Sequence, residues 1–118
     1  MNWKGNIVFL GVDDLQEVDV FYRKELGLSL FKDQGLCRIY NIPGGGKIGF
    51  CTHMEKNIAD KSPIITLLTE DVDQVYQKLK KSKYDIVKSP EHNYDFNIYH
   101  FFLKDPQGYT VEIQKFLS

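Results

Sequence analysis

The sequence has few of the features that mark secreted, membrane or nucleic-acid-binding proteins. Its 118 residues include only two cysteines and four prolines, and the formal net charge at pH 7 is -1. The apolar stretch near the N-terminus is too short for a signal peptide or a membrane span, so we expect a cytoplasmic protein without membrane contact. The near-neutral charge does not predict binding to nucleic acid. In the cytoplasm, Cys37 and Cys51 are expected to be reduced thiols by default.

What the sequence does contain is an internal repeat. The segments VDDLQEVDVFY and TEDVDQVYQKL align with Asp14 over Asp71, an offset of 57 residues (71 − 14) that is close to half of the chain. Both segments begin with capping-box chemistry, which predicts helices near 14–26 and 71–82. Gly27 suits the left-handed end of the first helix.

A second pair of segments repeats the same order of turn and strand. NIPGGGKIGFC, 41–51, aligns with KDPQGYTVEIQ, 104–114, at an offset of 63 residues (104 − 41). In both, Pro is followed two residues later by Gly, which is turn chemistry, and an alternating strand comes next. Each half therefore predicts a strand, a helix and three further strands. The predicted strands lie near 5–12, 28–33, 35–42 and 47–53, and near 63–69, 84–88, 97–104 and 109–116.

These elements predict an α+β fold made of tandem βαβββ modules in a single domain. The first module covers 1–54, a polar linker covers 55–62, and the second module covers 63–118. The segments VDDLQEVDVFYRKELGL and FFLKDPQGYTVEI resemble the first strand–helix junction and the final hairpin of the vicinal oxygen chelate superfamily. This superfamily includes glyoxalase I, extradiol dioxygenases, and fosfomycin- and bleomycin-resistance proteins. The resemblance implies curled mixed sheets around a cavity, with the helices on the outer face.

The resemblance also implies where a divalent metal would bind. Catalytic members of the superfamily hold the metal with four side chains, one from the first and one from the last strand of each module. Those positions fall on Ile7, Gly49, Ile64 and Glu112. One carboxylate is fewer than the three protein ligands of a usual catalytic site, so we expect the protein to use no metal cofactor of this kind.

Glu112 is the first candidate for a ligand-binding residue. Alternation in the last strand predicts that Val111 and Ile113 face the helices, so Glu112 faces the other side of the sheet. On that side it either lines a cavity and hydrogen-bonds a ligand, or lies at an exposed rim.

Cys51 and His53 share one face of a strand and are further candidates. Such a pair can ligate a soft metal or activate a thiolate, although a core thiol and a strand-end histidine are the commoner reading. Cys37 and Cys51 are equidistant from Gly44, so we expect them to be cross-strand neighbours. A redox-sensing disulfide between them is the alternative to free thiols.

The strand near 97–104 supplies the remaining candidates. His100 lies beside the strand of Glu112, and the length of the turn decides whether it faces the cavity or the helices. Tyr99 and Phe101 belong to an aromatic cluster that is partly core and partly a flat wall for a planar ligand. His92 is expected in a loop.

The combined expectation is a metal-independent homodimer that binds a small organic molecule, similar to the bleomycin-resistance branch. The alternative is a metal-dependent lyase or thiol transferase with an atypical site, in which His100 or His53 joins Glu112. A further alternative is a structural or regulatory protein whose cavity is filled by its own side chains.

Overall fold

A computed structural model describes all residues, 1–118, and divides the chain into two compact units, Met1–Asn57 and Ile58–Ser118. The division falls inside the predicted linker 55–62. The first unit contains β1 (Asn6–Gly11), α1 (Leu15–Asp19), the π-helix η1 (Val20–Glu25), β2 (Leu30–Asp33), β3 (Cys37–Ile42) and β4 (Gly46–Cys51). The second contains β5 (Ile64–Leu68), α2 (Val72–Lys80), β6 (Glu91–Asn93), β7 (Ile98–Lys104) and β8 (Thr110–Phe116).

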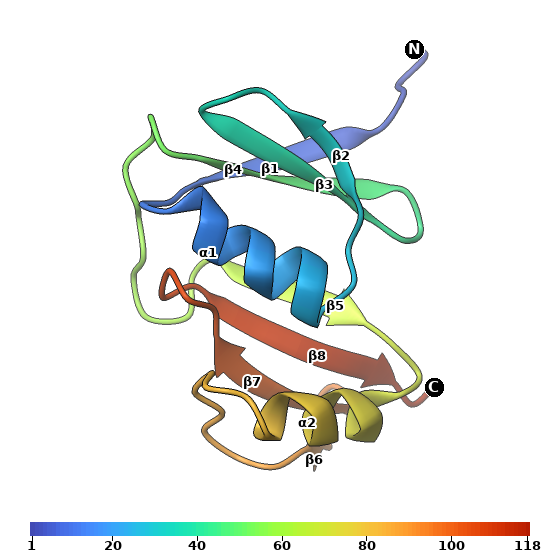
Figure 1. Cartoon of the computed structure of the whole chain (residues 1–118). Helices are drawn as coiled ribbons and strands as arrows, with labels where there is room; N and C mark the ends of the chain where they lie inside the picture. Colours follow the sequence, from blue (N-terminus) through green and yellow to red (C-terminus); the bar gives the residue numbers. More distant parts are fainter. The chain divides into compact units, whose positions relative to one another are not determined.

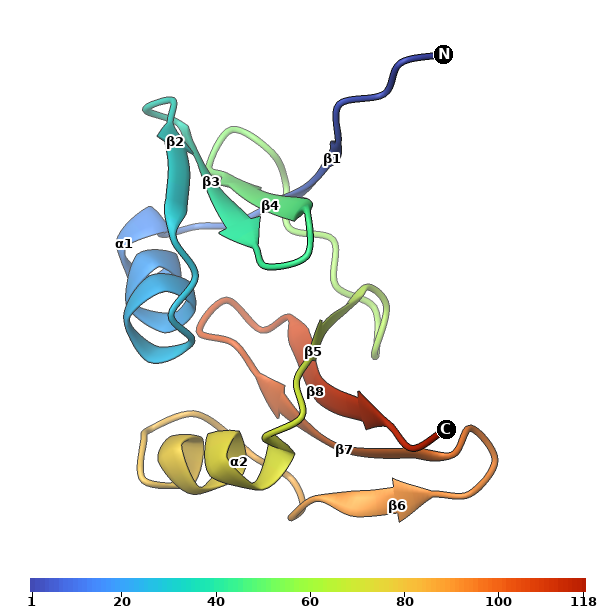
Figure 2. The same ribbon diagram turned by 90° about the vertical axis from the view of Figure 1, so that its right-hand side faces the viewer.

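The two units have the same sheet topology. The strand orders are β1-β4-β3-β2 and β5-β8-β7-β6, and in each sheet the first two strands of that order are parallel while the other pairs are antiparallel. Each sheet has a helix beside one face (Figure 1; Figure 2). The predicted α+β fold with a repeated βαβββ unit is therefore confirmed. None of the helices has the length and apolar character that spanning a membrane requires.

In the first unit, aromatic side chains join the helix to the sheet. The rings of Tyr22 and Phe50 lie 4.6 Å apart, and both side chains are buried. Tyr40 donates a 2.8 Å hydrogen bond to Oδ1 of Asp19, and Arg23 pairs with the same carboxylate at 2.7 Å. Because each polar group here has a partner, the carboxylate is buried without an unsatisfied oxygen.

The two helices begin differently, although the sequence predicts the same cap for both. Asp14 accepts hydrogen bonds from the backbone N–H groups of Gln16 and Glu17, as predicted. The prediction for Asp71 is wrong, because its side chain makes no capping bond and its own N–H donates to Thr69 instead. At the other end of the first helical segment, Gly27 adopts a φ of 78°, which confirms the left-handed end.

In the second unit, the helix packs on the face that carries Val111 and Ile113. The rings of Tyr76 on α2 and Phe101 on β7 lie 5.4 Å apart in an edge-to-face arrangement. Ile113 is the cross-strand partner of Phe101, and directly opposed residues share a face of the sheet. The predicted orientation of β8 is therefore confirmed.

One predicted strand is wrong. The segment 84–88 contributes only an isolated bridge at Ile86, and the edge strand is β6, three residues beyond it. The Asn93 side chain accepts hydrogen bonds from the backbone N–H groups of Asp95 and Phe96, which forms a tight turn at the end of β6. This turn determines which residues pair with β7 as the edge strand. His92 consequently lies on β6 rather than in a loop, and it bonds Oδ1 of Asn97.

Candidate functional site

The turn between β7 and β8 decides which residues meet on the second sheet. Oδ1 of Asp105 accepts the backbone N–H groups of Gln107 and Tyr109, and Gly108 adopts a φ of 95°. This turn sets His100 opposite Gln114 and Phe102 opposite Glu112. The sequence did not determine which face of the sheet carries the His100 side chain. The register places it on the same face as Glu112, away from the helix.

His100 and Glu112 form a buried pair on this face. Nδ1 of His100 lies 2.6 Å from Oε2 of Glu112, and both residues are only 7% exposed. Thr66 on β5 donates a 2.8 Å hydrogen bond to the other oxygen, Oε1. Both carboxylate oxygens therefore have partners from neighbouring strands. The exposed-rim alternative for Glu112 is wrong.

The pKa of the Glu112 carboxyl shows how this pair is charged. Burial alone would raise the pKa, but side-chain hydrogen bonds with Thr66, His100 and Gln114 lower it, and the net result is a lowered pKa. Glu112 is therefore ionised at neutral pH, and His100 donates its Nδ1 proton to it. This bond fixes the imidazole and leaves Nε2 as the ring atom available for another contact.

A pocket of about 190 Å³ opens beside His100. Phe102 forms part of its apolar wall, and its ring meets His100 edge-to-face with centroids 5.1 Å apart. Nζ of Lys61 lies 4.5 Å from the centre of the Phe102 ring. The lining residues are Lys61, Val87, Lys88, Ser89, Glu91, His100, Phe101 and Phe102.

The structure brings only part of the predicted set together. Tyr99 lies on the helix side, where its hydroxyl donates a 2.6 Å hydrogen bond to Asp73. Phe101 contributes atoms to the pocket although its ring packs on Tyr76 of the helix. Glu112 is not among the pocket-lining residues and reaches the pocket through His100.

The four positions to which the family resemblance assigns metal ligands offer a single donor side chain. Ile7 and Ile64 have no donor atom, and both are exposed. A Cβ atom at Gly49 would lie 2.5 Å from the Phe9 ring, so Phe9 occupies the space that a ligating side chain would need. Glu112 is left as one donor, and it is already bonded to His100 and Thr66. No step of a metal-dependent reaction can be assigned to these four positions.

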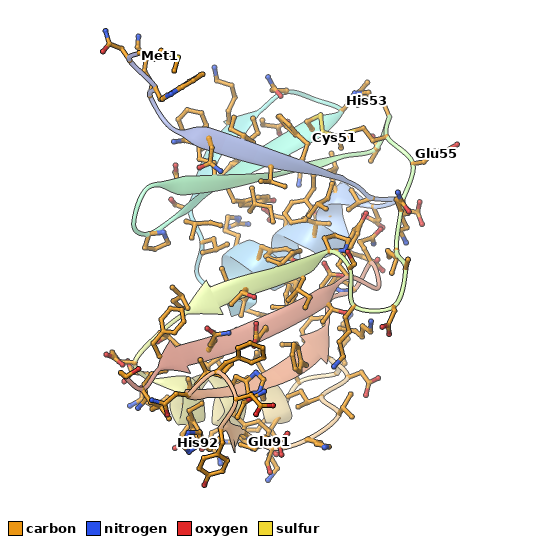
Figure 3. All side chains as sticks on the ribbon, turned by 180° about the vertical axis from the view of Figure 1, so that it is seen from behind. Met1, Cys51, His53, Glu55, Glu91 and His92 are labelled. Atoms are coloured by element: carbon orange, nitrogen blue, oxygen red, sulfur yellow. A yellow bond between two sulfur atoms is a disulfide. The ribbon has the colours of Figure 1, made fainter.

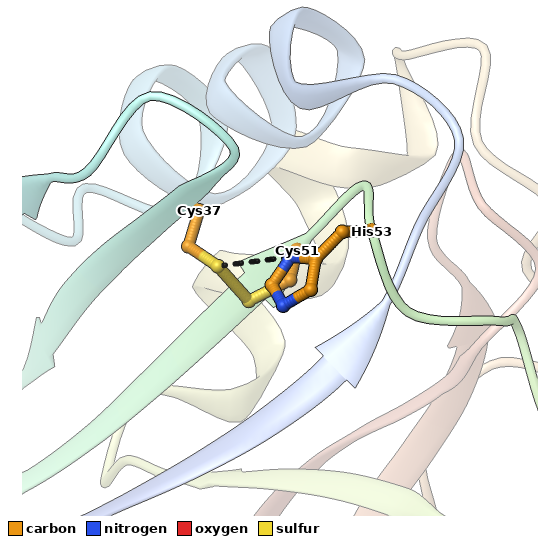
Figure 4. A group of neighbouring side chains, drawn as sticks. All are labelled: Cys37, Cys51 and His53. Atoms are coloured by element: carbon orange, nitrogen blue, oxygen red, sulfur yellow. Dashed lines mark hydrogen bonds between the residues drawn. A yellow bond between two sulfur atoms is a disulfide. The ribbon is translucent and has the colours of Figure 1, made fainter.

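Cys37 and Cys51 form a disulfide, which corrects the expectation of two free thiols. The two residues are directly opposite on β3 and β4, as their spacing around Gly44 predicts, and this placement brings the sulfur atoms together. His53 follows two residues after Cys51 (Figure 3). Its Nδ1 lies 3.7 Å from Sγ of Cys37, the contact that the dashed line marks in Figure 4. These residues belong to the first unit, whereas His100 and Glu112 belong to the second.

Sequence reasoning missed two residues of the second site. Thr66 lies two residues after Ile64 on β5 and is paired with Glu112. Strand alternation places Thr66 on the same face as Ile64, and this pattern could have identified it as a partner of Glu112. Lys61 precedes β5 in the polar linker, and nothing in its sequence context distinguishes it from the other lysines.

Comparison with known proteins assigns the family. The model of the Glyoxalase/Bleomycin resistance protein/Dioxygenase superfamily matches residues 5–113. A search of curated proteins finds no match. Among solved structures, a superfamily member from Sphaerobacter thermophilus is 18% identical, with a TM-score of 0.78 and coverage of 98% of both chains.

Two further solved structures have the same fold. A glyoxalase/bleomycin resistance protein/dioxygenase from Nocardioides is 15% identical, with a TM-score of 0.77, covering 100% of this chain and 86% of the other. A family enzyme from Burkholderia phytofirmans is 18% identical, with a TM-score of 0.78, covering 94% of this chain and 97% of the other. At these identities the structures establish the fold alone. The family match over nearly the whole chain shows that the protein belongs to the glyoxalase/bleomycin resistance protein/dioxygenase superfamily.

Proposed function

We propose that the protein binds a small organic anion with a single aromatic ring in the pocket beside His100. The observation that carries this proposal is the pocket itself, which combines an apolar wall with an oriented imidazole and two lysines. Ligand sites of this type are mostly apolar and contain a few fixed polar groups.

The size of the pocket limits the ligand. Its volume of about 190 Å³ is smaller than the roughly 300–1,000 Å³ of sites for drug-sized molecules. A cavity of about 150 Å³ in another protein accepts benzene. The pocket is therefore suited to one ring with a small substituent, and Phe102 offers that ring an aromatic neighbour.

The charges around the pocket favour an anion. Lys61 and Lys88 line it together with a single acidic residue, Glu91. Oε1 of Glu91 lies 3.8 Å from Nζ of Lys88, and both side chains are exposed. Water weakens this ion pair, so the lysine is available to an anionic ligand. Lys61 stands over Phe102, where its ammonium can meet a carboxylate attached to a ring stacked on the same wall.

His100 supplies the directional contact. Because Nδ1 donates to ionised Glu112, the ring cannot turn without losing a buried hydrogen bond. Nε2 then meets a ligand in a fixed direction. In this proposal Glu112 positions His100 and does not contact the ligand, which changes the role that the sequence predicted for it.

The same pair supports a second candidate function, proton transfer to or from the bound molecule. A histidine held by a carboxylate at one ring nitrogen is suited to accept a proton at the other. The observation that favours this candidate is the 2.6 Å bond between His100 and Glu112. Proton transfer by this pair requires no metal ion.

The test uses three single-ring probes that differ in charge: benzoate, benzyl alcohol and benzylamine. Isothermal titration calorimetry should detect benzoate binding, with at least tenfold weaker binding of the neutral and cationic probes. Lys61→Ala and His100→Gln should each weaken benzoate binding about tenfold or more, whereas Lys24→Ala, an exposed lysine of the first unit, should have no effect. Equal binding of all three probes, or no binding of any, would overturn the proposal. For the proton-transfer function the probe is phenylpyruvate, a single-ring anion with an acidic carbon–hydrogen bond. The protein should accelerate exchange of that proton with deuterated water, and His100→Gln should not.

A further inference from the structure

The first unit carries a second group of chemically reactive side chains, formed by Cys37, Cys51 and His53. Cys37 and Cys51 are directly opposite, and the neighbouring backbone bond from Thr52 N to Leu36 O marks them as a non-hydrogen-bonded pair, in which side chains approach most closely. His53 lies in the segment after β4, and its ring points toward the disulfide (Figure 4). The ligand atoms of the three residues all lie within 4.8 Å of one another.

We propose that this group is a redox-gated site for a thiophilic metal ion such as Zn²⁺. In the disulfide form both sulfur atoms are bonded to each other, so neither is a thiolate ligand. In the reduced form, two thiolates and the imidazole of His53 provide three ligands from the two strands and the segment that follows β4. This site is separate from the ligand pocket of the second unit and does not depend on it.

The spacing of the side chains suits a metal that they share. Zinc bonds to sulfur are about 2.3 Å long and those to histidine nitrogen about 2.0–2.1 Å, so in a tetrahedral site sulfur and nitrogen lie roughly 3.6 Å apart. The observed separation of Cys37 Sγ and His53 Nδ1 is 3.7 Å. The imidazole therefore needs little movement to become a ligand once the sulfur is free.

The donor types select the kind of metal. Two thiolates with an imidazole favour zinc or monovalent copper, whereas magnesium and calcium prefer oxygen donors. Cys37 and Cys51 are buried, and His53 is exposed. The metal would thus have a protein-covered side and a side open to solvent, where a fourth position takes water or an external molecule.

The redox step is an ordinary thiol–disulfide exchange. A dithiol reductant attacks one sulfur, the Cys37–Cys51 bond breaks, and the reductant leaves as its own disulfide after its second thiol resolves the mixed intermediate. The two electrons come from the dithiol, whose two protons pass to the released cysteines. Binding of Zn²⁺ then displaces both thiol protons to the solvent.

Cobalt titration tests the proposal directly. The protein is reduced with a phosphine under anaerobic conditions, the reductant is removed, and Co²⁺ is added while the near-ultraviolet and visible spectrum is recorded. Reduced protein should show thiolate-to-cobalt charge transfer that saturates at one equivalent and disappears when Zn²⁺ is added. Oxidised protein should show none of this absorption. Loss of the folded far-ultraviolet circular dichroism on reduction, or absence of the charge-transfer band in folded reduced protein, would overturn the proposal.

Three variants separate this site from adventitious binding. Cys37→Ser should abolish saturable one-equivalent binding, and His53→Ala should weaken Co²⁺ binding tenfold or more while both thiols remain. His92→Ala removes a histidine of the second unit and should leave the titration unchanged. Equal affinity of the His53→Ala variant and the unchanged protein would exclude His53 as a ligand and contradict the three-ligand site.

Discussion

The two units place different chemistry at equivalent positions of the same sheet. Cys37 and Cys51 face each other across β3 and β4, and His100 and Gln114 face each other across β7 and β8. Each residue of the second pair follows its counterpart by 63 residues (100 − 37 and 114 − 51). A covalent bond thus joins the two strands of one unit where hydrogen-bonding side chains occupy the other.

A second set of equivalent positions differs in the same sense. Phe9 is paired with Gly49 in the first sheet, and Thr66 is paired with Glu112 in the second. The phenyl ring fills the space above the glycine, whereas the hydroxyl donates to the carboxylate. The repeated backbone therefore does not impose a site. The side chains on the sheet face away from the helix decide whether that face is filled by an apolar ring or carries hydrogen-bonding groups.

Removal of the carboxylate from the second unit should have the largest effect on stability. Glu112→Ala removes the two hydrogen bonds that the buried, ionised carboxylate accepts from His100 and Thr66. Hydrogen bonds to a charged group contribute about 1.5–3 kcal/mol each, so the expected loss is about 3–6 kcal/mol. Urea unfolding followed by circular dichroism measures the difference. Glu91→Ala, which removes an exposed carboxylate of the same unit, should change the free energy of unfolding by less than about 0.5 kcal/mol.

Acid titration examines the same carboxylate without an apolar substitution. Because the pKa of Glu112 is lower in the folded state, its stabilising effect is fully present above the unfolded-state pKa near 4.5. It is lost as the pH falls through the lower folded-state pKa. The free energy of unfolding of Glu112→Gln should therefore fall less between pH 5 and strongly acidic solution than that of the unchanged protein. Parallel pH curves would contradict an ionised Glu112.

Loss of the disulfide should have the next largest effect. Cys37 and Cys51 are 14 residues apart, and closing a loop of this length stabilises a protein by about 3 kcal/mol through the unfolded state. Double substitution to serine should lower the free energy of unfolding by about that amount. A thiol assay under denaturing conditions provides the companion measurement, and it should detect no free thiol before reduction.

A smaller effect should result from a methyl group at Gly49. Gly49→Ala places Cβ against the Phe9 ring and should cost about 1–2 kcal/mol, since the ring must move. Adding Phe9→Ala should relieve this cost, so the two changes should be non-additive in a double-mutant cycle. Strict additivity would show that Phe9 does not fill the space above Gly49.

The smallest expected effect concerns the helix starts. Asp14→Ala removes two capping hydrogen bonds and should cost about 1 kcal/mol, whereas Asp71→Ala should cost little because Asp71 makes no capping bond. Thermal unfolding of the two variants gives the comparison. Equal shifts would indicate that the two helices begin in the same way after all.

Much of this architecture could be predicted from the sequence. The repeated helix starts, the Pro–x–Gly turns and the strand alternation predict the topology, the orientation of Glu112 and the opposition of Cys37 and Cys51. These features are local, and local turn chemistry determines the register of a hairpin.

Features that depend on contacts between segments could not be predicted. The side on which His100 lies depends on the hydrogen bonds of Asp105 inside the turn, and the bonds of Glu112 depend on Thr66 from a distant strand. The expectation of free thiols at Cys37 and Cys51 is wrong because it follows from the expected compartment, whereas the disulfide, the stated alternative, follows from their opposition across two strands. The edge strand was misplaced because the Asn93 turn, and not apolar alternation, fixes it.

Nuclear magnetic resonance of the histidine rings tests the central claim most directly. Spectra that correlate ring nitrogens with carbon-bound protons, assigned with His100→Gln, report which nitrogen of His100 carries a proton. We expect a protonated Nδ1 bonded to Glu112, and we expect benzoate to shift the His100 signals but not those of His53 or His92. A neutral His100 protonated at Nε2, with signals that no single-ring anion shifts, would contradict an oriented His100–Glu112 pair at a ligand pocket.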